Sequence, residues 1–302
     1  MLNLLLSIIG IYFFILIGFS AKALFKEKMV ESSFTLLSIY FLQPMLVFWG
    51  LLQRPIDISL ITTPLFYLAV VASVLLILPL LAKLLFKENN HRSILSISAV
   101  VGNTGNLGIP IGIALFGEAS IPYTTMINLA NVFVVYTVGV YFYSRGNFSL
   151  KASLLNIVKL PILWFSLLAV LFNLLGITLN EALNSVLEMG AYSSIVIQLV
   201  LFGMYLYGVK IEEVPKKLIS AVVGVKFLLL PGLTILLLSF THFDPMLKGV
   251  ILMELLMPLA VTNVTLASLY SCSPKVVALL IFVTTMLFVP VLFLMREIVE
   301  YL

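Results

Sequence analysis

Charge is what this sequence has least of. Only 10% of its 302 residues are charged, against roughly 25% in an ordinary soluble domain. Hydrophobic residues make up 62%, and so few charges cannot build the polar shell that a water-soluble core of this size requires. The composition therefore excludes a soluble protein and predicts one whose solvent is the lipid bilayer.

Residues that carry chemistry are scarce as well. Cys272 is the only cysteine, which excludes an intramolecular disulfide and a multi-cysteine metal site. The only two aspartates, Asp57 and Asp244, lie at the ends of apolar runs. Neither His91 nor His242 belongs to an HExxH motif, and the sequence has no GxSxG or GxxxxGK[ST] motif. We therefore expect no enzymatic activity, no metal, no cofactor and no direct use of ATP.

The basic residues are dispersed rather than clustered. The net charge of +4 and the isoelectric point near 9.0 could indicate nucleic-acid binding, but the lysines and arginines lie singly or in small groups between apolar runs. We interpret them as a signal for membrane orientation and expect no nucleic-acid partner. The apolar N-terminus has its first lysine only at Lys22, so we expect a retained first helix and not a cleaved signal peptide.

Ten apolar runs are long enough to cross the bilayer, which takes about 20 residues each. If the N-terminus is outside, fourteen of the 17 Lys and Arg residues fall at cytoplasmic turns and helix starts, and only Arg54, Lys248 and Arg296 fall outside. This positive-inside bias predicts a multi-pass protein of the cell (plasma or inner) membrane with both termini extracytoplasmic. The predicted spans are 3–23, 31–52, 58–86, 93–116, 121–143, 153–175, 182–208, 217–240, 246–270 and 275–296.

The ten spans divide into two halves of five, residues 1–150 and 151–302. An odd number of spans per half forces the halves into opposite orientation, which is the inverted repeat of many transporters. We therefore predict an all-α membrane protein of two inverted five-helix repeats. The prolines that match between the halves are Pro79 with Pro231 in the third spans, and Pro110 with Pro258 in the fourth.

The fourth span carries the most informative stretch, Val101–Gly112, which combines four glycines, Pro110 and three polar side chains. Such a helix breaks, and a break at membrane depth must be buried or line a wet cavity. We expect the second half-helix to start near Pro110 and to direct unpaired N–H groups at mid-membrane, where they would suit a carboxylate. The alternative is that the glycines only allow close helix packing and the asparagines bond neighbouring helices.

The ninth span repeats this pattern around Pro258. If both interrupted helices cross, their breaks share one site at the repeat interface. Glu254 is a candidate for binding a coupling proton or sodium ion, or else a neutral carboxyl hydrogen-bonded to a neighbouring helix. Gln43 and Gln198 are further candidates for the coupling ion or the cavity lining, with helix–helix hydrogen bonding as the alternative. Lys226 is expected to snorkel to the inner interface.

Three stretches together resemble a known family. They are Gly102–Pro110 followed by Leu115–Gly117, then Phe41–Phe48, and finally Met257–Val261 with Leu266–Tyr270. They are similar to the auxin efflux carrier family, which includes bacterial malonate and malate permeases and plant PIN-type carriers. The resemblance implies crossed broken helices 4 and 9 and a carboxylate-bearing substrate held at their crossing. It also allows a homodimer.

On this basis we predict a secondary transporter of small organic anions, such as dicarboxylates or auxin-like weak acids. The competing hypothesis is a membrane sensor that binds an organic acid without moving it. Asn263 follows Pro258 by five residues and Thr262 by four, which departs from the family pattern and leaves open which of them contacts substrate. The predicted substrate-binding residues are Asn103, Thr104, Asn106, Pro110, Pro258, Thr262 and Asn263.

Overall fold

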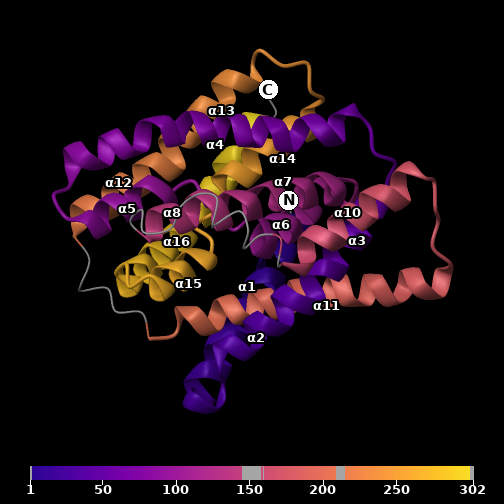
Figure 1. Ribbon diagram of the computed structural model, residues 1–302, viewed down its shortest axis with the longest axis horizontal. Coiled ribbons are helices and arrows are strands. Elements are labelled where there is room, and N and C mark those ends of the chain that lie inside the picture. The colour runs from indigo at the N-terminus through magenta and orange to yellow at the C-terminus, as the bar shows by residue number, and fades with distance from the viewer. Residues whose placement is uncertain (1, 145–157, 159, 209–214, 300–302) are drawn as a thin grey trace.

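The computed structural model describes residues 2–144, 158, 160–208 and 215–299 (Figure 1). In this part of the chain every regular element is a helix, and the only β-type pairing is one isolated bridge. The all-α prediction is therefore confirmed for the described residues.

Six predicted spans have a counterpart among the described helices that are long and apolar enough to cross a membrane. Each is a single helix or a run of α- and π-helical segments. They are α2–η2–α3 (Glu31–Leu37, Ser38–Leu42, Gln43–Leu52), α4 (Ile58–Leu85), α7–η5–α8 (Ile121–Val134, Val135–Gly139, Val140–Tyr143), α11 (Glu181–Leu206), α12–η7–α13 (Lys216–Gly224, Val225–Leu229, Leu230–Leu238) and α16 (Pro274–Val299).

The other four predicted spans differ from one another. The first is helical throughout, two are interrupted near their middle, and one begins among residues outside the described part of the chain. The count of ten spans and their inverted arrangement stay predictions. The elements concerned are α1 (Leu2–Phe25), α5–η3–α6 (Asn89–Ser98, Thr104–Gly108, Ile109–Phe116), α10 (Pro161–Leu174) and α14–α15 (Pro245–Leu256, Thr262–Leu269).

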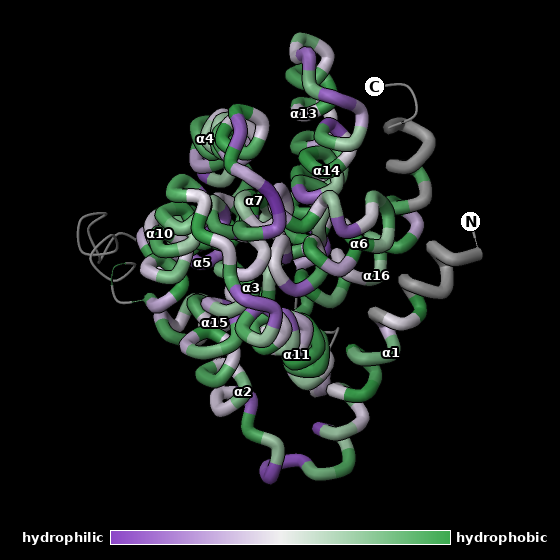
Figure 2. Tube along the Cα trace, turned by 90° about the vertical axis from the view of Figure 1, so that its right-hand side faces the viewer, coloured by the Kyte–Doolittle hydropathy of each residue, from purple (hydrophilic) through white to green (hydrophobic). Residues whose placement is uncertain are grey.

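The distribution of polarity is that of a protein in lipid. Large apolar side chains such as Leu76, Leu84 and Phe240 are about four-fifths exposed on the outside, whereas many buried side chains are polar. Figure 2 shows hydrophilic residues concentrated in the connections and in the middle of the molecule. Lipid can solvate the outer apolar surface, and the polar interior is where membrane proteins place functional groups.

Two groups of helices form the framework. In Figure 1, α11 runs beside α1 and α2, and α3 packs against both α10 and α11. On the other side α4 packs against α5, α7, α13 and α14. The interrupted helices belong to this second group.

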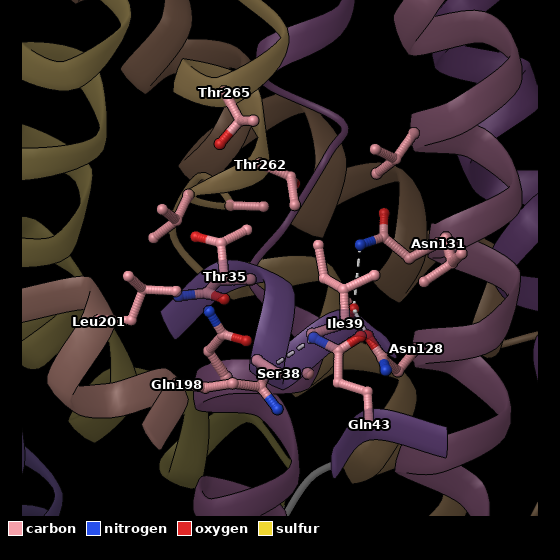
Figure 3. Close-up of a pocket in the computed structure, with 18 of the residues that line it drawn as sticks. Thr35, Ser38, Ile39, Gln43, Asn128, Asn131, Gln198, Leu201, Thr262 and Thr265 are labelled. Carbon is pink, nitrogen blue, oxygen red and sulfur yellow. Dashed lines mark hydrogen bonds between the residues drawn. The ribbon is translucent and has the colours of Figure 1, made fainter. Parts of the chain in front are cut away.

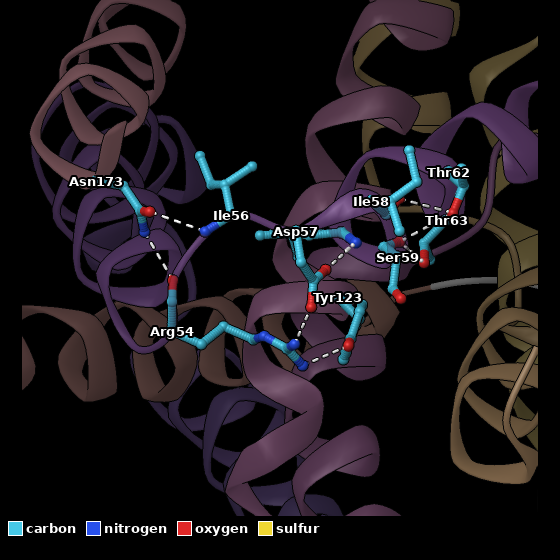
Figure 4. A network of polar contacts seen from close by, with 10 residues as sticks. Arg54, Ile56, Asp57, Ile58, Ser59, Thr62, Thr63, Tyr123 and Asn173 are labelled. Carbon is cyan, nitrogen blue, oxygen red and sulfur yellow. Dashed lines mark hydrogen bonds and ion pairs between the residues drawn. The ribbon is translucent and has the colours of Figure 1, made fainter. Parts of the chain in front are cut away.

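The connection between α3 and α4 is fixed by a polar network (Figure 4). Arg54 donates to Asp57 and to the Tyr123 hydroxyl of α7. From α10, the Asn173 side chain donates to the Arg54 carbonyl at 2.7 Å and accepts from the Ile56 N–H at 2.8 Å. This network joins the two groups of helices at one end of the molecule.

Glycines let α1 and α11 approach to backbone contact. A Cβ added to Gly18 would lie 1.8 Å from the Val200 carbonyl oxygen, and one added to Gly203 would lie 1.8 Å from that of Ile15. Backbone cannot yield as a flexible side chain can, so Gly18→Ala must separate the two helices. We expect a loss of about 1–3 kcal/mol in the free energy of unfolding, the usual cost of overpacking.

Thermal unfolding in detergent measures this effect, with Gly10→Ala as the matched control on the same helix. Nothing lies within 4 Å of a Cβ at Gly10, so its Tm is expected to stay at the wild-type value. Equal Tm values for the Gly18 and Gly10 variants would contradict the close helix contact.

Candidate functional site

The two helix interruptions pair with each other. Gly102 and Leu259 form an antiparallel bridge. The Asn103 N–H donates to the Pro258 carbonyl at 2.8 Å, and the Ala260 N–H donates to the Val101 carbonyl at 3.0 Å. Each break thus provides hydrogen-bond partners for backbone groups of the other. Such partners are required where neither water nor the regular bonds of a helix can supply them. Two segments more than 150 residues apart in the sequence meet at one point.

The first break leads through a π-helical turn into the second half-helix. The α6 helix begins at Ile109 with Pro110 in its first turn, but the π-helical turn η3 precedes it, so helical winding resumes at Thr104. The Leu107 and Gly108 N–H groups both bond to the Asn103 carbonyl. The α-helical second half thus starts near Pro110 as predicted, and the π-helical turn η3 before it was not predicted.

A cavity of about 80 Å³ lies beside the paired breaks. This is room for a few water molecules or one small ligand. Figure 3 shows its labelled polar side chains arriving from four directions: Thr35, Ser38 and Gln43 from α2–η2–α3, Gln198 from α11, Asn128 and Asn131 from α7, and Thr262 and Thr265 from α15.

Six of the predicted site residues line this cavity and four do not. None of the described residues that line it is a lysine, arginine, histidine, aspartate or glutamate, so its walls are neutral. The lining residues are Gln43, Asn103, Thr104, Asn106, Gln198 and Thr262, and the others are Pro110, Pro258, Asn263 and Glu254.

Two residues that line the cavity each carry a polar atom that is unsatisfied within the described part of the chain. The Asn103 Nδ2 and the Ser38 Oγ are buried and make no hydrogen bond there, and both residues are at least 97% buried. A buried donor without an acceptor is costly, and a ligand carrying acceptor oxygens would remove that cost. The cavity is thus prepared for hydrogen-bond acceptors.

The α7 helix supplies a hydrogen-bonded chain that the sequence reasoning missed. Asn131 Nδ2 donates to the Gly102 carbonyl at 2.8 Å and to Thr104 Oγ1 at 3.0 Å. Thr104 in turn donates to Asn128 Oδ1 at 3.0 Å, and the Tyr67 hydroxyl donates to Asn131 Oδ1 at 3.1 Å. The signal was available, because two asparagines three residues apart in an apolar span share one helix face.

Gln43 and Gln198 meet across the cavity. Gln43 Nε2 donates to Gln198 Oε1 at 3.3 Å, and Gln198 Nε2 donates to Ser194 Oγ at 2.8 Å. The sequence left cavity lining and helix–helix hydrogen bonding as alternatives for this pair. In the structure the two glutamines do both: they line the cavity, and they form a hydrogen bond between helices.

Thr262 and Asn263 have different places. Thr262 lines the cavity, whereas Asn263 is fully buried behind the second break. Asn263 Nδ2 donates to the carbonyls of Val101 and Ala260 at 3.1 and 3.0 Å, and its Oδ1 accepts from the Tyr143 hydroxyl at 2.9 Å. Asn263 therefore holds the two breaks together, and Thr262 is the residue positioned to meet a ligand.

Neither predicted proline lines the cavity. Pro258 lies within the second break, where its carbonyl receives the Asn103 N–H. Pro110 lies in the first turn of α6, beyond η3. Both prolines shape the breaks rather than the cavity walls.

Two comparisons with known proteins indicate membrane transport. A family model described as "Membrane transport protein" matches residues 4–153. By this match the first half of the chain belongs to this family. An uncharacterized transporter of Methanocaldococcus jannaschii is 29% identical over 215 residues, which cover 68% of each chain.

The resemblance to the auxin efflux carrier family is confirmed, and the protein is a multi-pass membrane transport protein. The matched segment coincides with the first predicted half and contains the first break together with Asn128 and Asn131. In this membrane transport protein the cavity at the paired breaks is accordingly the candidate transport site. The absence of enzymatic activity stays a prediction.

Two ionisable side chains of the transport protein lie near the breaks but outside the cavity lining. Glu254 is fully buried, with its carboxyl against Gly108. Lys226 is only 1% exposed, so the prediction that it snorkels to the inner interface was wrong. Its ammonium lies beside Gly102, where the missing glycine side chain leaves it room. Lys226 therefore drops out of the cytoplasmic cations that support the orientation.

Proposed function

We propose that the protein is a secondary transporter of small organic anions, such as dicarboxylates or auxin-like weak acids. The observation that carries the proposal is the antiparallel pairing of two interrupted helices beside a neutral, amide-rich cavity. Interrupted helices that meet inside a bundle are the usual way in which secondary transporters build a substrate site.

The chemistry of the cavity favours an anion with several acceptor oxygens. Asn103 Nδ2 and Ser38 Oγ are donors that no described residue satisfies. The helical segment Thr104–Phe116 starts at the break, so its first N–H groups and the positive end of its dipole are directed toward the cavity. A carboxylate accepts hydrogen bonds from all of these groups.

The two walls of the cavity support alternating access. Thr35, Ser38, Gln43 and Gln198 belong to the group of helices around α11, whereas the breaks and α7 belong to the group around α4. Movement of one group against the other would open the cavity to each side in turn. We propose that each group combines helices of both inverted repeats, residues 1–150 and 151–302, in a ten-span protein with both termini extracytoplasmic.

The test is uptake of labelled malonate, malate and indole-3-acetate by proteoliposomes under imposed pH and sodium gradients. Cysteines introduced at the predicted turns would report orientation by labelling from one side. We expect saturable uptake of at least one anion, with competition by unlabelled substrate. Empty liposomes and heat-inactivated protein serve as controls.

Saturable binding of the same anions without uptake would reject the carrier and favour the competing sensor hypothesis. Binding is measured on the detergent-solubilised protein, so that failure of insertion cannot imitate this outcome. Absence of both binding and uptake by folded protein would reject organic anions as the ligand class.

A further inference from the structure

Lys226 of η7 and Glu254 of α14 are both buried in the middle of the fold, at 1% and 0% exposure. Charges within a membrane protein are costly and are retained where they act on a substrate or ion. The transport site described above uses neither side chain. Both side chains nevertheless lie close to the residues that line the cavity.

The two side chains flank the first break at its two glycines. A Cβ on Gly102 would lie 3.1 Å from Lys226 Nζ, and a Cβ on Gly108 would lie 2.3 Å from Glu254 Oε2. Gly102 itself lines the cavity. The Lys226 ammonium is thus separated from the cavity by a residue that has no side chain to insulate it.

Lys226 and Glu254 interact electrostatically, but they are not among the ion pairs within 4.0 Å that the described part of the chain contains. Neither carboxylate oxygen of Glu254 accepts a hydrogen bond from a described residue. The carboxyl is therefore not locked in its ionised form by a direct partner, and it can hold a proton.

Other titratable groups near Glu254 are few. Tyr67 of α4 also interacts electrostatically with Glu254. The remaining titratable side chains described on elements packed against α14 lie near the helix ends, namely Lys83 on α4, Tyr123 on α7, Glu118 on η4 (Glu118–Ser120) and Lys275 on α16. Lys226 and Glu254 are the ionisable side chains that flank the first break at Gly102 and Gly108.

We propose that the Lys226 ammonium attracts the anion across Gly102, and that Glu254 is the proton acceptor that switches this attraction on. This inference rests on the proposed function. With Glu254 ionised, the pair is neutral as seen from the cavity. With Glu254 protonated, the Lys226 ammonium loses its carboxylate neighbour, and a bound anion takes the place of that negative charge in a medium of low dielectric constant. Proton and anion then bind cooperatively, and each raises the affinity for the other by the same factor.

The test compares wild type, Glu254→Gln and Lys226→Met, with the exposed Lys217→Met as a matched control. The dissociation constant of labelled malonate is measured from mildly acidic to neutral pH. The whole range lies above the second pKa of malonate, so that the ligand itself stays doubly ionised. Wild type and Lys217→Met are expected to bind malonate roughly 5-fold or more tightly at the acidic end of this range than at neutral pH. Glu254→Gln, which mimics the protonated carboxyl, is expected to bind tightly and without pH dependence.

Lys226→Met is expected to bind roughly tenfold or more weakly at every pH, the effect of losing a charged partner. If this variant does not fold, the double variant Lys226→Met/Glu254→Gln removes both charges and is expected to bind weakly without pH dependence. In proteoliposomes, a pH dye trapped inside should report acidification with malonate uptake by wild type but not by Glu254→Gln.

The outcomes separate this inference from the proposed function. Wild-type uptake of malonate with no acidification, together with unchanged pH dependence in Glu254→Gln, would overturn the proton switch and leave the anion transporter standing. Failure of wild type to bind or move any organic anion would instead overturn the proposed function.

Discussion

Asn103→Ala is expected to lower kcat/KM for organic-anion uptake by about tenfold to a hundredfold, with thermal stability close to wild type. A hydrogen bond to a charged group contributes about 1.5–3 kcal/mol, and each 1.4 kcal/mol is tenfold. The Asn103 Nδ2 has no partner among the described residues, so its removal breaks no contact that they show. The backbone N–H that bonds to Pro258 is kept in alanine.

Initial uptake rates over a range of substrate concentration, with Tm measured on the same preparation, check this expectation. Asn184→Ala is the matched control, because Asn184 of α11 lies at a different pocket and should leave both values unchanged. If Asn103→Ala transported normally, the donor facing the cavity would have no role in binding. If it lost activity only through lower stability, its role would be structural.

Asn263→Ala is expected to have the opposite effect, a loss of about 3 kcal/mol in the free energy of unfolding. The substitution removes the hydrogen bonds to the carbonyls of Val101 and Ala260 and leaves the buried Tyr143 hydroxyl without its acceptor. Buried polar groups left unsatisfied cost about 1–3 kcal/mol each. Because Asn263 does not line the cavity, the remaining folded protein should keep a near-normal KM.

Chemical denaturation of wild type, Asn263→Ala, Tyr143→Phe and the double variant measures this effect as a double-mutant cycle. We expect the sum of the two single losses to exceed the loss in the double variant, because both substitutions break the same hydrogen bond. A raised KM in Asn263→Ala with unchanged stability would instead make Asn263 a substrate ligand. That result would reopen the choice between Thr262 and Asn263.

The sequence located the helix interruptions and several residues of the cavity because the physical signal there is strong. Glycine, proline and polar residues in the middle of an apolar span are unfavourable in a lipid-facing helix, so Asn103, Thr104 and Asn106 could be assigned to a cavity in advance. The same reasoning missed Asn128 and Asn131. Their helix is not interrupted at these positions, and asparagines that line a cavity look like asparagines that bond neighbouring helices.

Lys226 shows where sequence reasoning fails. In a linear sequence, a lysine near the end of an apolar span is expected to reach the interface with its flexible side chain. The structure instead directs it to Gly102, a residue 124 positions away in the chain, where a side chain is missing. No local pattern near Lys226 encodes that gap.

The sequence by itself determined that this is an integral membrane protein, that it is helical, and that two of its helices are interrupted by polar segments. These properties follow from composition and from the cost of polar groups in lipid, which act on each segment separately. Only the tertiary structure decided that the interruptions pair, that Thr262 faces the cavity while Asn263 supports it, and that Lys226 and Glu254 flank one break. Such relations depend on which distant backbones meet and on where a glycine leaves space, because they are set by packing between segments rather than by any segment alone.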